Sequence, residues 1–182
     1  MTLNDIISSS LTMLERGADA QTIDHYRAQF TKYANDAVFE LARRFKQQRR
    51  ETVALTDGTF DVAQLSRECL RVTQVLVDGK PVLYRQNPWG SGVFRVAASG
   101  AEEAEVHYRF VPRDMESSTD VPELPAYMHR LIPYYVAACQ RCGGDPDTQG
   151  TSSAHFALFN SMVSNLQRET RGEPQSFRLL HY

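Results

Sequence analysis

The spacing of hydrophobic positions divides the chain into a helical beginning, a strand-rich middle and a helical end. Over residues 3–14 and again over 22–45, apolar side chains recur at every third or fourth position, which is the period of an amphipathic α-helix. Gly17 predicts the end of the first helix, and Thr22 a cap for the second. The second helix ends in a cluster of cations, which suits the negative end of its dipole.

From residue 51 the hydrophobic period changes to 2, which predicts β-strands. Asp57-Gly58 and Asp78-Gly79 are two-residue turn signals, and they predict two hairpins. Five or six short antiparallel strands follow from the pattern, at 51–56, 59–62, 70–77, 80–84, 93–96 and 104–111. One face of this sheet is expected to be buried, and the other to carry Arg71, Arg95, Glu105 and Arg109.

Helical spacing returns after Asp120. Pro122 and Pro125 suit the start of a helix whose apolar stripe runs to Cys139, and Pro133 predicts a kink within it. After the break at 143–146, Ser152 or Ser153 is expected to cap a last helix with apolar positions from Phe156 to Leu166. Residues 172–182 have no period and read as an extended tail.

The order of these elements predicts an α+β fold. The economical packing is a four-helix bundle with a small antiparallel β-sheet inserted between the second and third helices. We expect one composite domain over 1–182, with helical segments at 1–50 and 116–171, the β insertion at 51–115 and the tail at 172–182.

Composition narrows the class of protein. The chain has 182 residues, of which 42% are hydrophobic and 23% charged, and a net charge of -2, so it is expected to fold and to lack the basic field of a dedicated nucleic-acid binder. No apolar run approaches the ~20 residues of a membrane helix, and the first residues lack the pattern of a signal peptide. We therefore expect a cytoplasmic origin with three reduced cysteines.

The motifs that carry chemistry lack their usual context. Cys139 and Cys142 have zinc spacing, but His155 is the single nearby ligand type and the pair ends a predicted helix. The five histidines are dispersed, and no serine-nucleophile, phosphate-loop or dinucleotide motif occurs. Three carboxylates near a turn are interpreted as a solvated edge: Glu102, Glu103 and Glu105. We expect no catalytic residue, no cofactor and no metal.

Two surfaces are candidates for binding. A basic run could face DNA or form a rim, or could simply cap a helix; it contains Arg43, Arg44, Lys46, Arg49 and Arg50. The C-terminal tail places four large apolar side chains in its last six residues, where termini are normally polar: Phe177, Leu179, Leu180 and Tyr182. Such a tail either binds a partner or packs back on its own helices.

Three segments resemble the head-to-tail connector (adaptor, or head completion) proteins of tailed bacteriophages. The first comprises Leu3–Ile7 and Ala34–Val38 in the two N-terminal helices, ahead of the strands. The second is Val77–Val82 in the middle sheet. The third runs from Val121-Pro122-Glu123-Leu124-Pro125 through Tyr127–Ala138 to Gly144-Asp145 and the aromatic helix from His155. The resemblance covers most of the chain.

The resemblance implies a structural virion protein without catalysis, located in the neck between head and tail and in the host cytoplasm during assembly. Copies would form a homo-oligomeric ring, commonly twelve-fold, below the portal vertex, and DNA would pass through its lumen without specific binding. The implied partners are the portal protein and the next neck or tail protein, a nozzle or stopper. The apolar tail would reach the portal.

Two other readings stay open at this point. The chain could be a small bacterial ligand-binding or regulatory module, with a pocket formed by the sheet face and the region of Trp89. It could also be an enzyme that uses His107 or the cysteines.

Overall fold

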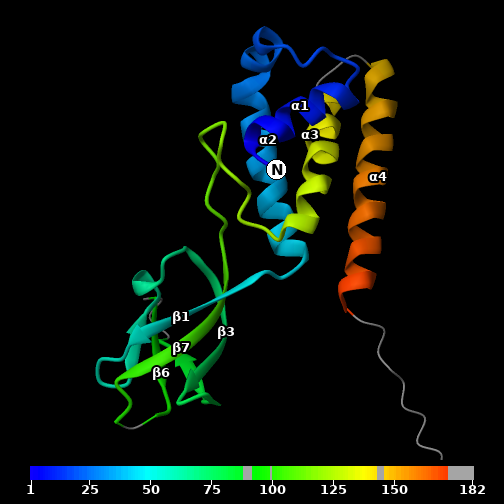
Figure 1. The fold of residues 1–182 in the computed structure, drawn as a ribbon. Coiled ribbons are helices and arrows are strands. Elements are labelled where there is room, and N and C mark those ends of the chain that lie inside the picture. Colours follow the sequence, from blue (N-terminus) through cyan, green and yellow to red (C-terminus); the bar gives the residue numbers. More distant parts are fainter. Residues whose placement is uncertain (88–91, 99, 143–145, 172–182) are drawn as a thin grey trace, which may run out of the picture. The chain divides into compact units, whose positions relative to one another are not determined.

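The computed structural model describes residues 1–87, 92–98, 100–142 and 146–171, with the backbone alone for 146–153 and 171. Four α-helices and seven strands form there, with two short 3₁₀ segments at Val62–Gln64 and Ala126–Leu131 (Figure 1). The helices are α1 (Leu3–Met13), α2 (Ala20–Arg44), α3 (Ile132–Cys142) and α4 (Pro146–Arg171). The strands are β1 (Gln48–Ala54), β2 (Thr59–Asp61), β3 (Cys69–Val77), β4 (Lys80–Pro81), β5 (Tyr84–Gln86), β6 (Val93–Val96) and β7 (Glu103–Phe110). A mixed fold of helices and antiparallel strands is thereby confirmed, whereas the four-helix bundle around an inserted sheet stays a prediction.

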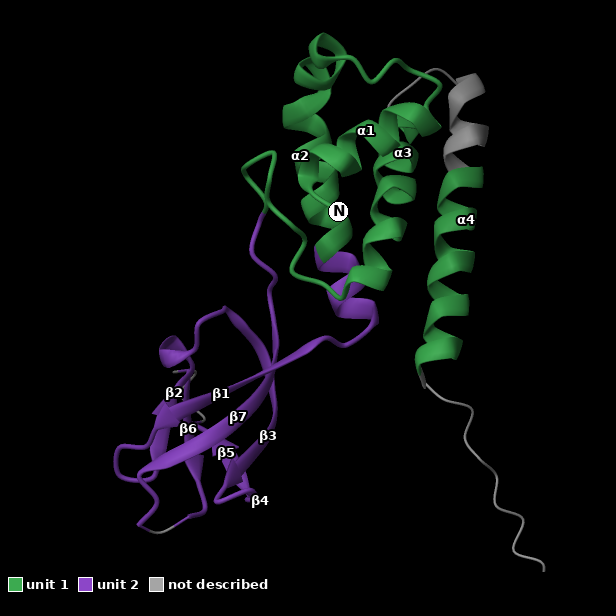
Figure 2. Ribbon diagram, viewed as in Figure 1, with its two compact units in different colours: residues 1–38, 115–182 green, residues 39–114 purple. Residues whose placement is uncertain are grey.

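The chain divides into two compact units (Figure 2). The helical unit comprises residues 1–38 and 115–182, and the β unit comprises residues 39–114. The division falls inside α2, between Val38 and Phe39. The β unit is therefore a single stretch of sequence inserted into the sequence of the helical unit.

The helical unit is built on the predicted apolar stripes. Helix α1 begins with a capping box in which Thr2 and Asp5 bond each other's backbone amides, and its buried face carries Leu3, Ile6 and Leu11. Helix α3 contacts both α1 and α4. The contact with α4 includes Tyr135, whose ring meets Phe159 edge to face at 5.3 Å between centroids.

Two predicted helix boundaries and one predicted kink are wrong, each for a local reason. Helix α1 ends before Gly17: Glu15 takes the left-handed conformation at φ 59°, and Arg16 N–H donates to Leu11 O at 2.9 Å. Pro133 lies in the first turn of α3, where no intrahelical bond is lost, so it produces no kink. Helix α4 begins at Pro146, so Ser152 and Ser153 lie inside the helix and not at its start.

The segment that returns from the β unit is fixed to α2 and α1. The Asn35 side chain donates to Met115 O at 3.1 Å and accepts from Met115 N–H at 3.0 Å. Five residues later, Asp120 O accepts from the Leu3 amide at 2.8 Å, so this loop also satisfies a free amide at the start of α1. Met115 itself is buried, so its backbone groups have little access to water.

The β unit contains two antiparallel sheets instead of the single predicted sheet. Their strand orders are β1-β7-β3-β4 and β2-β6-β5. The hairpin at Asp78-Gly79 is confirmed by the pairing of β3 with β4. The predicted hairpin at Asp57-Gly58 is wrong, although its turn forms: both residues have positive φ, and Thr56 pairs with Thr59. The strands on either side do not pair with each other, because β1 pairs with β7 and β2 pairs with β6.

The two sheets enclose one hydrophobic core. Strand β7 alternates as predicted, with Ala104, Val106, Tyr108 and Phe110 buried and the residues between them on the outer face. The second sheet contributes Phe60 and Phe94, whose rings stack at 5.4 Å. Each sheet therefore covers the apolar face of the other, which is why the outer faces are polar.

A partly buried polar network ties β1 to β7 and to the loop before β3. The Glu51 carboxylate accepts from the Tyr108 hydroxyl at 2.6 Å, from the Ser66 amide at 2.8 Å and from Arg49 Nε at 2.9 Å. Burial raises the pKa of Glu51, but the hydrogen bonds from Ser66 and Tyr108 and the charge of Arg49 outweigh it and lower the pKa to about 2. Burial, and then the bond to Glu51, raise the pKa of Tyr108 to about 12.

Substitution of Asn35 by Ala is expected to destabilise the protein by about 2 kcal/mol, because it leaves a buried amide and carbonyl of Met115 without partners. Urea unfolding followed by circular dichroism measures this free energy. Gln29→Ala is the matched control, since Gln29 also bonds through its side chain amide but on the exposed surface of α2, to the Tyr33 hydroxyl. Equal losses for both variants would contradict the role given to Asn35.

Acid is expected to destabilise the β unit through Glu51. Its folded pKa of about 2 lies below the value of 4.5 for a free carboxyl, so its stabilisation is complete above about pH 4.5 and is lost as the pH falls through 2. The loss is on the order of 2 to 3 kcal/mol. Unfolding free energies measured between pH 6 and pH 2 test this: Glu51→Gln should flatten the dependence, and Tyr108→Phe should reduce it. A slope in Glu51→Gln as steep as in the parent protein would refute the assignment.

Candidate interaction surfaces

The basic run lies where the chain passes from α2 into β1. Helix α2 ends in a turn in which Lys46 has φ 53° and Gln47 N–H donates to Ala42 O at 2.9 Å. Backbone hydrogen bonds therefore hold the basic run in place. Its arginines lie in the last turn of α2 and on β1, an edge strand of the four-stranded sheet.

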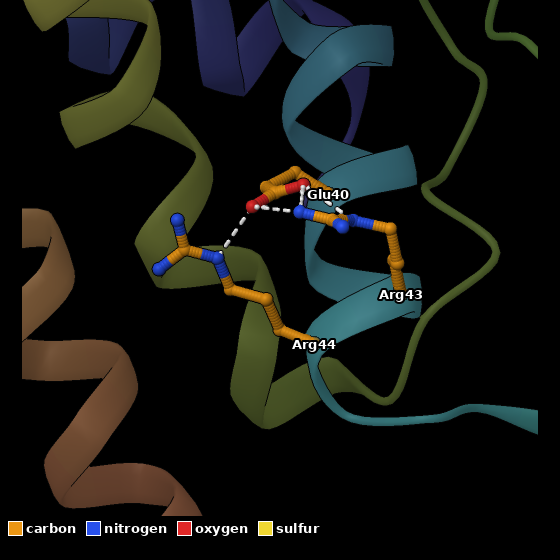
Figure 3. A network of polar contacts seen from close by, with 3 residues as sticks. All are labelled: Glu40, Arg43 and Arg44. Atoms are coloured by element: carbon orange, nitrogen blue, oxygen red, sulfur yellow. Dashed lines mark hydrogen bonds and ion pairs between the residues drawn. The ribbon is translucent and has the colours of Figure 1, made fainter.

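Two of these arginines share one carboxylate within α2 (Figure 3). The Glu40 carboxylate lies between their guanidinium groups, with Arg43 Nη2 at 2.9 Å and Arg44 Nε at 2.5 Å. Partial burial raises the pKa of Glu40, but the hydrogen bonds and charges of Arg44 and Arg43 outweigh it and hold the pKa below its usual range. One carboxylate therefore offsets part of the positive charge of this cluster, and Arg43 remains largely exposed.

The remaining predicted cations separate on the two faces of β1. Arg49 points to the inner side and pairs with Glu51. Arg50 is exposed on the outer face, directly opposite His107 of β7. Lys46 is also exposed. The structure therefore places the five predicted basic residues on different elements and on both faces of β1.

A different set of cations does come together on the outer face of the four-stranded sheet. Strand pairing places Arg50 opposite His107, and Arg71 of β3 opposite Arg109 of β7. The alternation of apolar and polar residues along the chain is enough to predict that Arg71 and Arg109 lie on the exposed face. Their pairing with each other and with the end of the basic run required the strand order, which no local pattern contains.

The predicted portal-binding side chains, Phe177, Leu179, Leu180 and Tyr182, lie outside the described residues, and so does Trp89. The helical unit nevertheless exposes apolar side chains of its own. Val121 is 56% exposed, and Tyr127 and Leu158 are each 47% exposed. Among the described residues, no helix is long and apolar enough to cross a membrane.

The residues weighed for catalysis or metal binding lie in different parts of the fold, with Cys139 and Cys142 in α3 and His107 in β7. Burial, and then the neighbouring Cys142, raise the pKa of the Cys139 thiol to about 11, which disfavours the nucleophilic thiolate. His107 Nε2 lies 2.6 Å from Glu105, on the outer face of the sheet. Within the part of the chain that the structure describes, no group of His, Cys, Asp and Glu side chains is arranged to hold a metal ion.

Comparison with known proteins gives the family. A search of curated proteins found no match. A family model described as "SU10 adaptor protein" matches residues 1–178, which span the described parts of both the helical unit and the β unit. That extent agrees with the adaptor resemblance found in the sequence. The chain belongs to the SU10 adaptor protein family, a family of bacteriophage head-tail adaptors, and is thus a structural component of a virion.

Proposed function

We propose that this protein is a head-to-tail adaptor subunit that forms a ring below the portal vertex, joins the DNA-filled capsid to the tail and leaves a channel for DNA. The match to the adaptor family over residues 1–178 carries the proposal. In such a ring the partners are the portal protein on one side and the next neck or tail protein, a nozzle or stopper, on the other.

The architecture supports subunits that associate through weak repeated contacts. A closed ring joins one surface of each copy to a different surface of the next, and closure makes many weak contacts stable together. The exposed apolar side chains of the helical unit, such as Val121 and Tyr127, are suited to such contacts. The ring size, expected to be twelve-fold, follows from the resemblance.

The tail is proposed to bind the portal. Its apolar residues in positions 177–182 follow directly after the end of α4 at Arg171 and the polar stretch around Pro174. A segment that becomes ordered only against the portal would couple folding to docking and keep free subunits apart until heads are ready.

The alternative of a small ligand-binding module requires a pocket near Trp89. The family match over both units favours the adaptor over this module. Negative-stain images of purified protein mixed with portal-bearing capsids separate the two, because only an adaptor gives a ring at one unique vertex. Capsids decorated nowhere, or uniformly, would refute the adaptor assignment.

Deletion of residues 173–182 is expected to weaken binding to the portal by at least tenfold, since it removes four large apolar side chains. A sharper variant replaces Phe177, Leu179, Leu180 and Tyr182 by Ser, and its matched control replaces Gln175 and Ser176 by Ala. Binding to immobilised portal is measured for all three. Undiminished binding by the deletion variant would remove the tail from the proposal.

A further inference from the structure

We propose that the outer face of the four-stranded sheet binds the phosphate backbone of duplex DNA through an arginine face formed by Arg50, Arg71 and Arg109, with His107 between them. The choice of DNA as the polyanion rests on the proposed function, in which the duplex passes the adaptor. The site itself follows from the strand register.

The register brings like charges together. Arg71 and Arg109 are direct cross-strand partners, and such partners have Cβ atoms about 5 Å apart. Arg50 faces His107, which lies two residues before Arg109 on the same face of β7 and so about 7 Å along the strand. Three guanidinium groups therefore share a small area of one sheet. Like charges directly opposite each other destabilise a sheet, so a bound anion would stabilise this arrangement.

The protein does not supply that anion. In the described chain, Arg50, Arg71 and Arg109 make no ion pair or side-chain hydrogen bond, in contrast to Arg43, Arg44 and Arg49. Arg109 Nε is buried and has no hydrogen-bond partner. The nearest acidic side chain on β7, Glu105, is engaged with His107. A buried donor on a permanent cation without an acceptor is costly. A phosphate would bind the other guanidinium nitrogens of Arg109 and offset its charge.

The irregular pairing of β3 shapes this face. Strand β3 departs from regular register between Cys69 and Arg71 and again between Val72 and Gln74. The second irregularity puts Gln74, opposite His107, on the same side as Arg71, while Val72 and Val75 both remain buried. The Thr73 hydroxyl donates to His107 O at 3.0 Å and stabilises the distortion. Bulges of this kind re-aim side chains, and here they add an amide donor beside the arginines.

The chemistry of the face favours a duplex backbone. Guanidinium groups bind phosphate in a bidentate manner, and the polar neighbours Gln48, Thr52 and Gln74 offer further hydrogen bonds. No Phe, Tyr or Trp side chain is among the outer-face partners of β1, β3 and β7, so single-stranded bases would find no stacking platform. Contacts to phosphates alone carry no sequence information, which suits a surface past which any sequence must move.

The test uses the full-length protein and a fluorescein-labelled 30-base-pair duplex of arbitrary sequence, with anisotropy measured from 20 to 150 mM salt. The double variant Arg71→Gln/Arg109→Gln is expected to weaken binding about tenfold and to lower the slope of log K against log salt by about 2, because two phosphate contacts are lost. Its thermal stability is expected to stay equal or rise, since the repulsive pair is removed.

The matched control is Arg85→Gln/Arg95→Gln. These two arginines are exposed and are also direct cross-strand partners, but in the three-stranded sheet, so the variant makes the same change in charge and pairing elsewhere in the β unit. It is expected to bind DNA as the parent protein does. An equal loss in both variants would overturn the proposal in favour of a general charge effect. If the first variant does not fold, Arg50→Gln replaces it, with an expected loss of about threefold.

Two further outcomes bear on the proposal. Absence of DNA binding by the parent protein at 20 mM salt would overturn it, and so would tighter binding of a polyglutamate peptide than of the duplex, which would make this face a site for an acidic protein. Docking on portal-bearing capsids is scored separately on the same preparations. Docking without DNA binding removes this inference alone, whereas DNA binding without docking removes the adaptor function.

Discussion

The paired hydrogen bonds between Asn35 and Met115 fix the point on which the rest of the structure depends. A β unit inserted into a helical unit requires that the chain leave and return at nearly the same place. Asn35 lies three residues before the boundary and Met115 immediately after it, so one side-chain amide holds both ends within the helical unit. The β unit has its own closure, because its first strand, β1, pairs with its last, β7. The chain passes between the units twice, and each unit holds these two segments together by its own contacts.

The positive charge of the β unit is unevenly distributed, because carboxylates pair with some of its arginines and not with others. Residues 39–114 contain 12 Lys and Arg against 10 Asp and Glu, so their net charge is small. Glu40 pairs with Arg43 and Arg44, and Glu51 pairs with Arg49. Arg50, Arg71 and Arg109 have no such partner and lie on one face of the four-stranded sheet. A protein of nearly neutral composition can therefore present a local cationic surface without the broad basic field that would hold DNA in place.

Most helices and strands could be predicted from the sequence, because the spacing of apolar residues over short stretches differs between a helix and a strand. The apolar stripes of α1 and α2, the alternation of β7 and the turn at Asp78-Gly79 all appear where the pattern indicates them. The errors occurred where a local signal had two meanings. Pro133 can kink a helix or begin one, and Asp57-Gly58 can join paired strands or redirect the chain between two sheets. Only packing against the rest of the chain selects between such meanings.

By itself, the sequence determined the fold class, the approximate extent of most elements and the resemblance to phage adaptors, because these depend on residue order over short distances. The tertiary structure alone decided which arginines pair with a carboxylate and which lie together. Arg49 and Arg50 are neighbours in sequence, yet Arg49 pairs with the half-buried carboxylate of Glu51, and Arg50 lies on the outer face with Arg71 and Arg109. Pleating sends adjacent side chains to opposite faces, and strand order brings together residues that are distant in sequence. The physical character of a charged residue in this protein is therefore set by its partners across the sheet.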